Sequence, residues 1–261
     1  MSINLEKSKQ YIKEKVKEKP DIGIFLLGFQ NQFHELIQNI KDLICIPYKD
    51  IPILKHLYGK LLFGKMNNKN IIFFMETLIE IQKINHHYFP IILCKNIGIN
   101  KLIFINESYG VNPNYKIGDV MFIQDHINFF PEKNKVKKLI KNNFWEIIQP
   151  YDQNMLEIAE NIAMNHNIMI QKGIYVSIPY FNYRTYAEYS MIRSMGGDCI
   201  GMDLPTDVLI AKYMNIKIFA ITMIIMIESY KKKHARSFFI PEIEPSISLV
   251  ILIINDLIQC Y

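Results

Sequence analysis

Two patterns of apolar and polar positions alternate along the chain: short apolar runs, and segments in which apolar residues recur at helical spacing. The run at 22–27 is typical of a buried strand. In the segment at 154–166, Leu156, Ala159 and Ala163 fall on one helical face. Strands are predicted at 22–27, 60–66, 70–75, 101–106, 119–124, 173–178, 198–202 and 216–224, and helices at 2–19, 33–40, 88–95, 154–166, 185–195, 205–214 and 246–259.

Alternating strands and helices predict an α/β fold with a mixed, mostly parallel central sheet and helices on both faces. No linker rich in proline, glycine or serine interrupts residues 1–261, so we expect a single domain. The runs at 60–66 and 70–75 predict a hairpin, because the asparagines between them tolerate left-handed turn geometry.

In sheets of this kind, ligands bind outside the carboxyl ends of the strands. Several strand ends are therefore the first places to look for a site. They are Gly28, Asn106 and the predicted turn at 109–113, residues 178–185, residues 202–207, and the stretch after Thr222.

Composition indicates an ordered, water-soluble chain, since 50% of its 261 residues are hydrophobic and 21% are charged. The longest apolar stretch, at 218–227, falls short of the roughly 20 residues that a membrane helix needs, so no membrane association is expected. Three of the four widely spaced cysteines lie in apolar runs and are expected to be buried, and no cysteine or histidine spacing indicates a disulfide or a metal site. The charged first segment lacks a signal-peptide pattern, which favours the cytoplasm.

Charge gives no indication of nucleic-acid binding, although the formal net charge is +5. The lysines of the first segment alternate with Glu6, Glu14 and Glu18, as on a solvated helix face. No recognisable nucleic-acid module with stacking aromatic residues is present. We therefore expect no nucleic-acid partner.

Two neighbouring segments carry a family resemblance. Residues 105–113 read INESYGVNP and residues 115–128 read YKIGDVMFIQDHIN. They resemble T-N-A-A-G-G-L-N-P and F-x-x-G-D-[IV]-M-x-I-x-D-H-I-N of the trimeric purine nucleoside phosphorylases. Shorter matches are GIYV at 173–176, YRTYAE at 183–188, MGGDCIGM at 195–202, and Tyr151-Asp152 before a helix.

Several residues of these motifs are expected to serve the fold and not the chemistry. We expect Asp119, Asp125 and His126 to support a strand and its turns. Four glycines are expected to be turn residues: Gly118, Gly196, Gly197 and Gly201.

The resemblance implies phosphorolysis of purine (deoxy)ribonucleosides to free base and (deoxy)ribose 1-phosphate. Inorganic phosphate would be the co-substrate, with no metal or organic cofactor. It also implies a homotrimer in which neighbouring subunits complete each other's sites near Tyr151 and Asp152.

Site residues carried over from the resemblance are few. Asn106, Tyr183 and Met202 match or nearly match substrate-binding positions of the family. His56 corresponds to a phosphate-binding histidine but is displaced by one position. No catalytic residue can be assigned in this way.

Other site positions depart from the family pattern. A glycine-rich loop with a phosphate-binding serine is replaced by LGFQN at 27–31, and an Arg and a His that hold phosphate are replaced by Leu78 and Glu80. A further serine is Asp203, an asparagine that donates to the purine is Met226, and the glutamate that reads the base is Arg184. Because Arg184 and Asp203 both change the local charge, we hypothesise that they form an ion pair.

Three functions follow from this mixture of matches and departures. The first is a working phosphorylase with altered contacts. The second is a phosphate-independent nucleoside hydrolase, with Glu80 or Asp203 as general base. The third is a catalytically silent member of the family, kept for oligomer or partner contacts.

Overall fold

One mixed sheet organises the protein in a computed structural model that describes residues 2–28, 33–76, 88–129, 148–179, 185–202, 204–227 and 243–261. Its strand order is β2-β3-β4-β1-β5-β8-β7-β6-β9, and β9 pairs with β5 as well, so that the last five strands close into a ring. The strands are β1 (Ile22–Leu26), β2 (Lys41–Pro47), β3 (Gly59–Met66), β4 (Lys69–Glu76), β5 (Lys101–Gly110), β6 (Val120–Asn128), β7 (Gln171–Ser177), β8 (Cys199–Gly201) and β9 (Lys217–Ile227).

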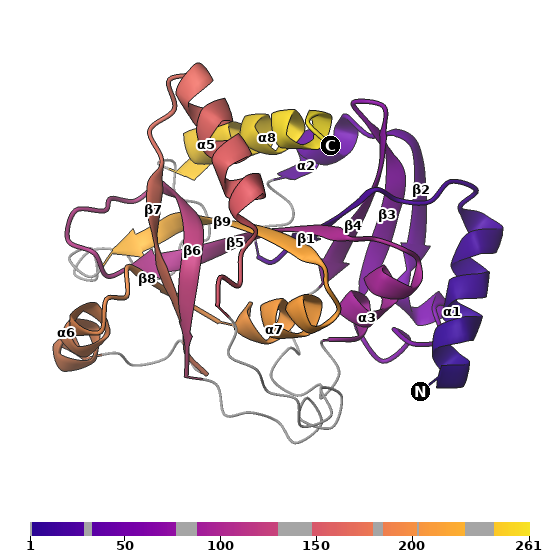
Figure 1. Cartoon of the computed structure of the whole chain (residues 1–261), viewed down its shortest axis with the longest axis horizontal. Helices are drawn as coiled ribbons and strands as arrows, with labels where there is room; N and C mark the ends of the chain where they lie inside the picture. The colour runs from indigo at the N-terminus through magenta and orange to yellow at the C-terminus, as the bar shows by residue number, and fades with distance from the viewer. Residues whose placement is uncertain are drawn as a thin grey trace.

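Helices cover both faces of this sheet, which confirms the predicted α/β class. Figure 1 shows α5 and α8 together on one face and α3 and α7 on the other, while α1 packs against α3 at one end. The helices are α1 (Ser2–Lys15), α2 (His34–Gln38), α3 (Phe89–Asn96), α5 (Gln153–Asn165), α6 (Tyr186–Ser194), α7 (Pro205–Tyr213) and α8 (Glu244–Gln259), with a 3-10 turn η2 at Tyr48–Asp50. In the described part of the chain, no helix is long and apolar enough to cross a membrane.

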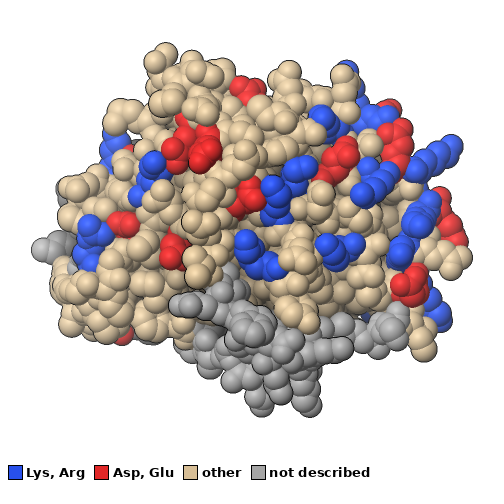
Figure 2. All heavy atoms as spheres, in the orientation of Figure 1, with Lys and Arg blue, Asp and Glu red and all other residues tan. Residues whose placement is uncertain are grey.

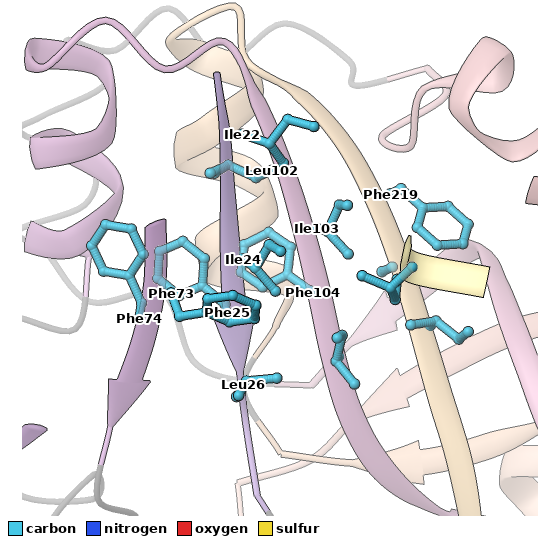
Figure 3. Close-up of a cluster of buried hydrophobic side chains, with 14 of the residues drawn as sticks. Ile22, Ile24, Phe25, Leu26, Phe73, Phe74, Leu102, Ile103, Phe104 and Phe219 are labelled. Atoms are coloured by element: carbon cyan, nitrogen blue, oxygen red, sulfur yellow. The ribbon is translucent and has the colours of Figure 1, made fainter. Parts of the chain in front are cut away.

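The core is built on β1, which lies between β4 and β5 and pairs with both in parallel. All five residues of β1 are buried, because helices cover a parallel strand on both faces. Phe25 stacks on Phe74 at 4.4 Å and on Phe104 at 4.9 Å between ring centroids (Figure 3). One apolar cluster extends from Ile12 to Ile258, which supports the single domain predicted over residues 1–261.

The predicted hairpin is confirmed as β3 and β4. Asn67 and Asn68 join them with φ of 49° and 62°, the left-handed geometry that asparagine accepts.

β6 and β9 run four and three residues beyond their predicted ends at 124 and 224, so Asp125 and His126 lie inside β6 and not at its end. Two other strands differ more. β2 was not predicted because it is an edge strand in which residues 41–45 are exposed and no apolar alternation marks it. β5 continues through the predicted turn at 109–113 as far as Gly110, because it pairs with β9 along its whole length and with β8 at its end.

Cysteine burial also differs. Cys94 and Cys199 are buried, whereas Cys45 and Cys260 are exposed, so two cysteines are buried where three were expected. All four are free thiols.

Candidate active site

The chain reverses its direction of winding between β1 and β5. From the carboxyl end of β1 it runs to β2, on the β4 side of the sheet, whereas from the end of β5 it runs to β6 in the ring. Such a switch point between parallel strands is where α/β proteins bind ligands. Gly28, Asn106 and Glu107 lie there, and we call these three residues the strand-end site.

Gly28 and Glu107 are in contact across the switch point. The backbone N–H of Leu27 donates to the carbonyl of Ile105 at 2.9 Å, which keeps the two strands paired up to the site. Gly28 has φ of 93°, and a Cβ placed on it would lie 2.8 Å from Cδ and 3.0 Å from Oε2 of Glu107. Position 28 therefore needs glycine both for its backbone conformation and for the space that the Glu107 carboxyl occupies.

Asn106 is the buried polar residue of the strand-end site. It is 4% exposed, and neither its Oδ1 nor its Nδ2 has a hydrogen-bond partner among the described residues. Its neighbours are satisfied, since Thr222 Oγ1 donates to Ser108 Oγ at 2.9 Å. A buried amide without partners costs about 1–3 kcal/mol, and a polar ligand removes that cost.

Glu107 has an unusual acidity. Burial raises the pKa of its carboxyl to about 7, because desolvation disfavours the charged form. Its Oε2 is buried without a partner among the described residues. Near neutral pH this carboxyl exists in both protonation states.

The raised pKa predicts a specific pH dependence of stability. The folded pKa of Glu107 lies above the ordinary value of 4.5, so its protonated carboxyl stabilises the folded state fully below about pH 4.5, and this stabilisation is lost as pH rises through about 7. We expect the rise in pH between these limits to lower the free energy of unfolding by about 2–3 kcal/mol. Urea unfolding of wild type and Glu107→Gln at several pH values measures this. An identical pH slope in both proteins would contradict it.

Met202 approaches the strand-end site from the ring. It follows β8, which runs antiparallel to β5 with Ile200 opposite Tyr109, so the end of β8 points back towards Glu107. Tyr175 Oη donates to the Met202 carbonyl at 3.0 Å. A Cβ on Gly201 would lie 1.8 Å from Tyr175 Oη, so glycine is required at position 201 for close packing. The Met202 side chain itself is half-buried, and its role in binding substrate stays a prediction.

His56 lies farther from the site. It is exposed in the segment before β3, and the first residue of β3, Gly59, pairs with Glu76 at the end of β4. His56 is therefore at the same edge of the sheet, but β4 separates its strand from β1. Its predicted contact with phosphate remains untested.

Several predicted positions lie outside the described residues: Tyr183, Arg184, Asp203, Leu78 and Glu80. The proposed ion pair between Arg184 and Asp203 is among them. Met226 is described; it is partly buried and lies opposite Tyr109 at the end of β9.

Asp198 holds three of the motif segments together. Its carboxylate accepts from Arg193 at 2.6 Å, from the amide of Asn112 at 2.8 Å and from the N–H of Ile174 at 2.9 Å. A Cβ on Gly173 would collide with this carboxylate at 2.5 Å. One side chain thus joins three motif segments, at 112–113, 173–176 and 196–198. This is a structural role.

Other motif residues also serve the fold. Asp119 accepts from the N–H of Lys116 at 3.1 Å within its turn, as expected. Gly118 and Gly196 both have φ of 90°, as turn residues do. His126 Nδ1 lies 3.1 Å from Tyr151 Oη, and this contact joins β6 to the segment before α5. Burial lowers the pKa of His126.

Glu107 is the site residue that motif comparison overlooked. In the resemblance, alanine stands where this chain has Glu107, so the difference was visible as a departure from the motif. Its importance depends on the contact with Gly28, which only the pairing of β1 with β5 creates.

Comparison with known proteins shows the family of the chain. The profile of the "Phosphorylase superfamily" matches residues 22–238. Purine nucleoside phosphorylase 1 of Bacillus subtilis is 30% identical over 240 residues, covering 86% of this chain and 85% of that protein. The Geobacillus stearothermophilus protein of the same name is 29% identical, covering 84% of this chain and 83% of its own length.

Solved structures show the same fold. Schistosoma mansoni purine nucleoside phosphorylase in complex with adenosine superposes with a TM-score of 0.82 at 22% identity, covering 98% of this chain and 96% of that one. The complex of that protein with inosine gives a TM-score of 0.81 at 23% identity, covering 99% and 96%. The chain belongs to the phosphorylase superfamily and, within it, to the purine nucleoside phosphorylases.

Proposed function

We propose that the protein catalyses phosphorolysis of purine nucleosides, giving the free base and (deoxy)ribose 1-phosphate. The observation that carries this is Asn106, a family motif residue held at the switch point with both amide atoms unpartnered among the described residues. The relatives that match most of the chain are named for this activity.

The reaction determines which charges the site must stabilise. The bond between base and sugar breaks while phosphate attacks the sugar, so the sugar gains positive charge and the purine negative charge. Fixed donors aimed at the purine and the phosphate stabilise their negative charge in the transition state, and the phosphate anion balances the positive charge of the sugar. Asn106 supplies both a donor and an acceptor in a buried position.

Inorganic phosphate is the proposed co-substrate, without a metal or organic cofactor. Among the described residues, no group of three or more metal-binding side chains occurs.

The proposal predicts base release from inosine that depends on phosphate. With purified protein, hypoxanthine and ribose 1-phosphate should form in equal amounts when phosphate is present, and neither should form without it. Release of hypoxanthine and ribose at the same rate without phosphate would identify a hydrolase. No turnover by folded protein with purine nucleosides would identify a silent member of the family.

We further propose a homotrimer, which the resemblance near Tyr151 and Asp152 suggests. Tyr151 is buried, and Asp152 begins α5 by accepting from the N–H of Met155 at 3.0 Å, so both residues lie in the ordered segment that leads into α5. Light scattering after size exclusion should give three times the chain mass of 30.8 kDa. A mass of one chain would contradict the trimer.

The cytoplasm is the proposed location, supported by four free cysteines, as expected in a reducing compartment. Nucleic acid is not among the proposed partners. On the face shown in Figure 2, basic side chains are interspersed with acidic ones, unlike the continuous basic surfaces that bind nucleic acid.

A further inference from the structure

Glu107 places a carboxyl group where an anion is expected to bind. Its Cδ and Oε2 lie against Gly28, the first glycine of the loop that corresponds to the family's phosphate loop. The family pattern that this segment resembles has alanine at position 107, so this acid is a departure from that pattern. A carboxylate and a phosphate a few ångströms apart repel each other strongly in a partly dry site.

The described surroundings of Glu107 offer no counter-charge. On one side β1 ends in Leu26, Leu27 and Gly28, and on the other β9 presents Thr222 and Met223 opposite Asn106 and Glu107. The titratable groups nearby are Tyr109 on β5 and Cys199 on β8, and the pKa of Cys199 is raised to about 12, so this thiol stays neutral. Burial is the cause of the shift in Glu107, and no charged group of the described chain adds to it.

We propose that Glu107 makes binding of the anionic co-substrate dependent on protonation: phosphate binds at the strand-end site when the Glu107 carboxyl is protonated, and this carboxyl then donates a hydrogen bond to the anion. This inference rests on the proposed function, because it assumes that phosphate binds beside Gly28. A protonated carboxyl beside Gly28 converts a repulsive position into a donor, which a tetrahedral anion needs.

The size of the effect follows from the protonated fraction. With a pKa of about 7, that fraction falls about tenfold between about pH 6 and pH 8. Apparent affinity for the anion falls by the same factor, and each binding event at the higher pH takes up close to one proton.

Sulfate is the probe that tests this, because it is a tetrahedral dianion that does not titrate in this range, unlike phosphate. Calorimetric titrations in two buffers with different ionisation enthalpies give both the Kd and the number of protons taken up. For the wild-type protein we expect Kd to rise about tenfold from about pH 6 to pH 8, with proton uptake. For Glu107→Gln we expect a Kd independent of pH and no proton uptake.

Glu157→Gln is the matched control, since Glu157 is an exposed residue of α5 and should leave the pH dependence unchanged. Thermal unfolding verifies that each variant is folded. A wild-type affinity that does not change with pH, a Glu107→Gln protein that keeps the slope, or no sulfate binding near pH 6 would each overturn the inference.

The outcomes also separate this inference from the proposed function. If phosphorolysis occurs but sulfate binding does not depend on pH, only the proposed role of Glu107 is wrong. If sulfate binding is linked to proton uptake but no phosphorolysis occurs, the anion site is supported and the proposed reaction is wrong.

Discussion

Replacing Asn106 by alanine is expected to lower kcat/KM for phosphorolysis of inosine about 100-fold, the usual cost of losing one fixed donor to the transition state. The free energy of unfolding should stay within about 1 kcal/mol of the wild-type value or rise, because the variant no longer buries an amide without partners. Steady-state kinetics and urea unfolding on the same preparations measure both quantities.

Asn112→Ala is the control for this prediction. Asn112 lies in the same motif, but its amide donates to Asp198 at 2.8 Å and its Oδ1 accepts from the N–H of Asn114 at 3.1 Å. We expect this variant to lose about 1 kcal/mol of stability and to keep kcat/KM within a few-fold of wild type. Equal losses of activity in the two variants, or an Asn106→Ala protein destabilised by several kcal/mol, would show that Asn106 is structural.

Phe25→Ala is expected to have the largest effect on stability, lowering the free energy of unfolding by about 3–5 kcal/mol. Phe25 is 2% exposed and stacks on Phe74 and Phe104, so its removal opens a cavity between three strands of the core (Figure 3). Surrounding side chains on rigid parallel strands cannot close such a cavity.

Phe129→Ala provides the comparison, because Phe129 is 41% exposed and its removal leaves no cavity. We expect a change within about 0.5 kcal/mol. Urea unfolding in parallel gives both values. A loss of less than about 1.5 kcal/mol for Phe25→Ala would contradict the close packing of Phe25 between β4 and β5.

Much of the fold could be predicted because the strands that organise it are buried on both faces. β1 and β9 are continuous apolar runs with nearly every residue buried, and such runs are visible in the sequence. The β3–β4 hairpin was predictable from the runs at 60–66 and 70–75 and the asparagines between them. α6 was equally clear, since Thr185 and Glu188 form a capping box at its start.

The parts that were missed depend on pairing between distant segments. β2 is held at the sheet edge by β3, and its apolar run is only four residues long, at 43–46, with most side chains of the strand exposed. β5 extends to Gly110 because β9 and β8 continue beside it. Neither partner is near β5 in the sequence.

The site could be predicted only in outline, because part of it also depends on pairing between distant segments. Asn106 was identified from its motif and its place at a strand end, and the structure adds that its amide is buried and unpartnered among the described residues. Glu107 was missed because its significance comes from its contact with Gly28, which lies 79 positions earlier in the chain. Only the parallel pairing of β1 with β5 brings the two together.

The initial rate of hypoxanthine release from inosine, measured against phosphate concentration for wild type and Asn106→Ala side by side, tests the central claim most directly. The account predicts a wild-type rate that rises from zero and saturates with phosphate, and a rate about 100-fold lower for a folded Asn106→Ala protein. A wild-type rate independent of phosphate, or equal rates for the two proteins, would contradict phosphorolysis at the strand-end site.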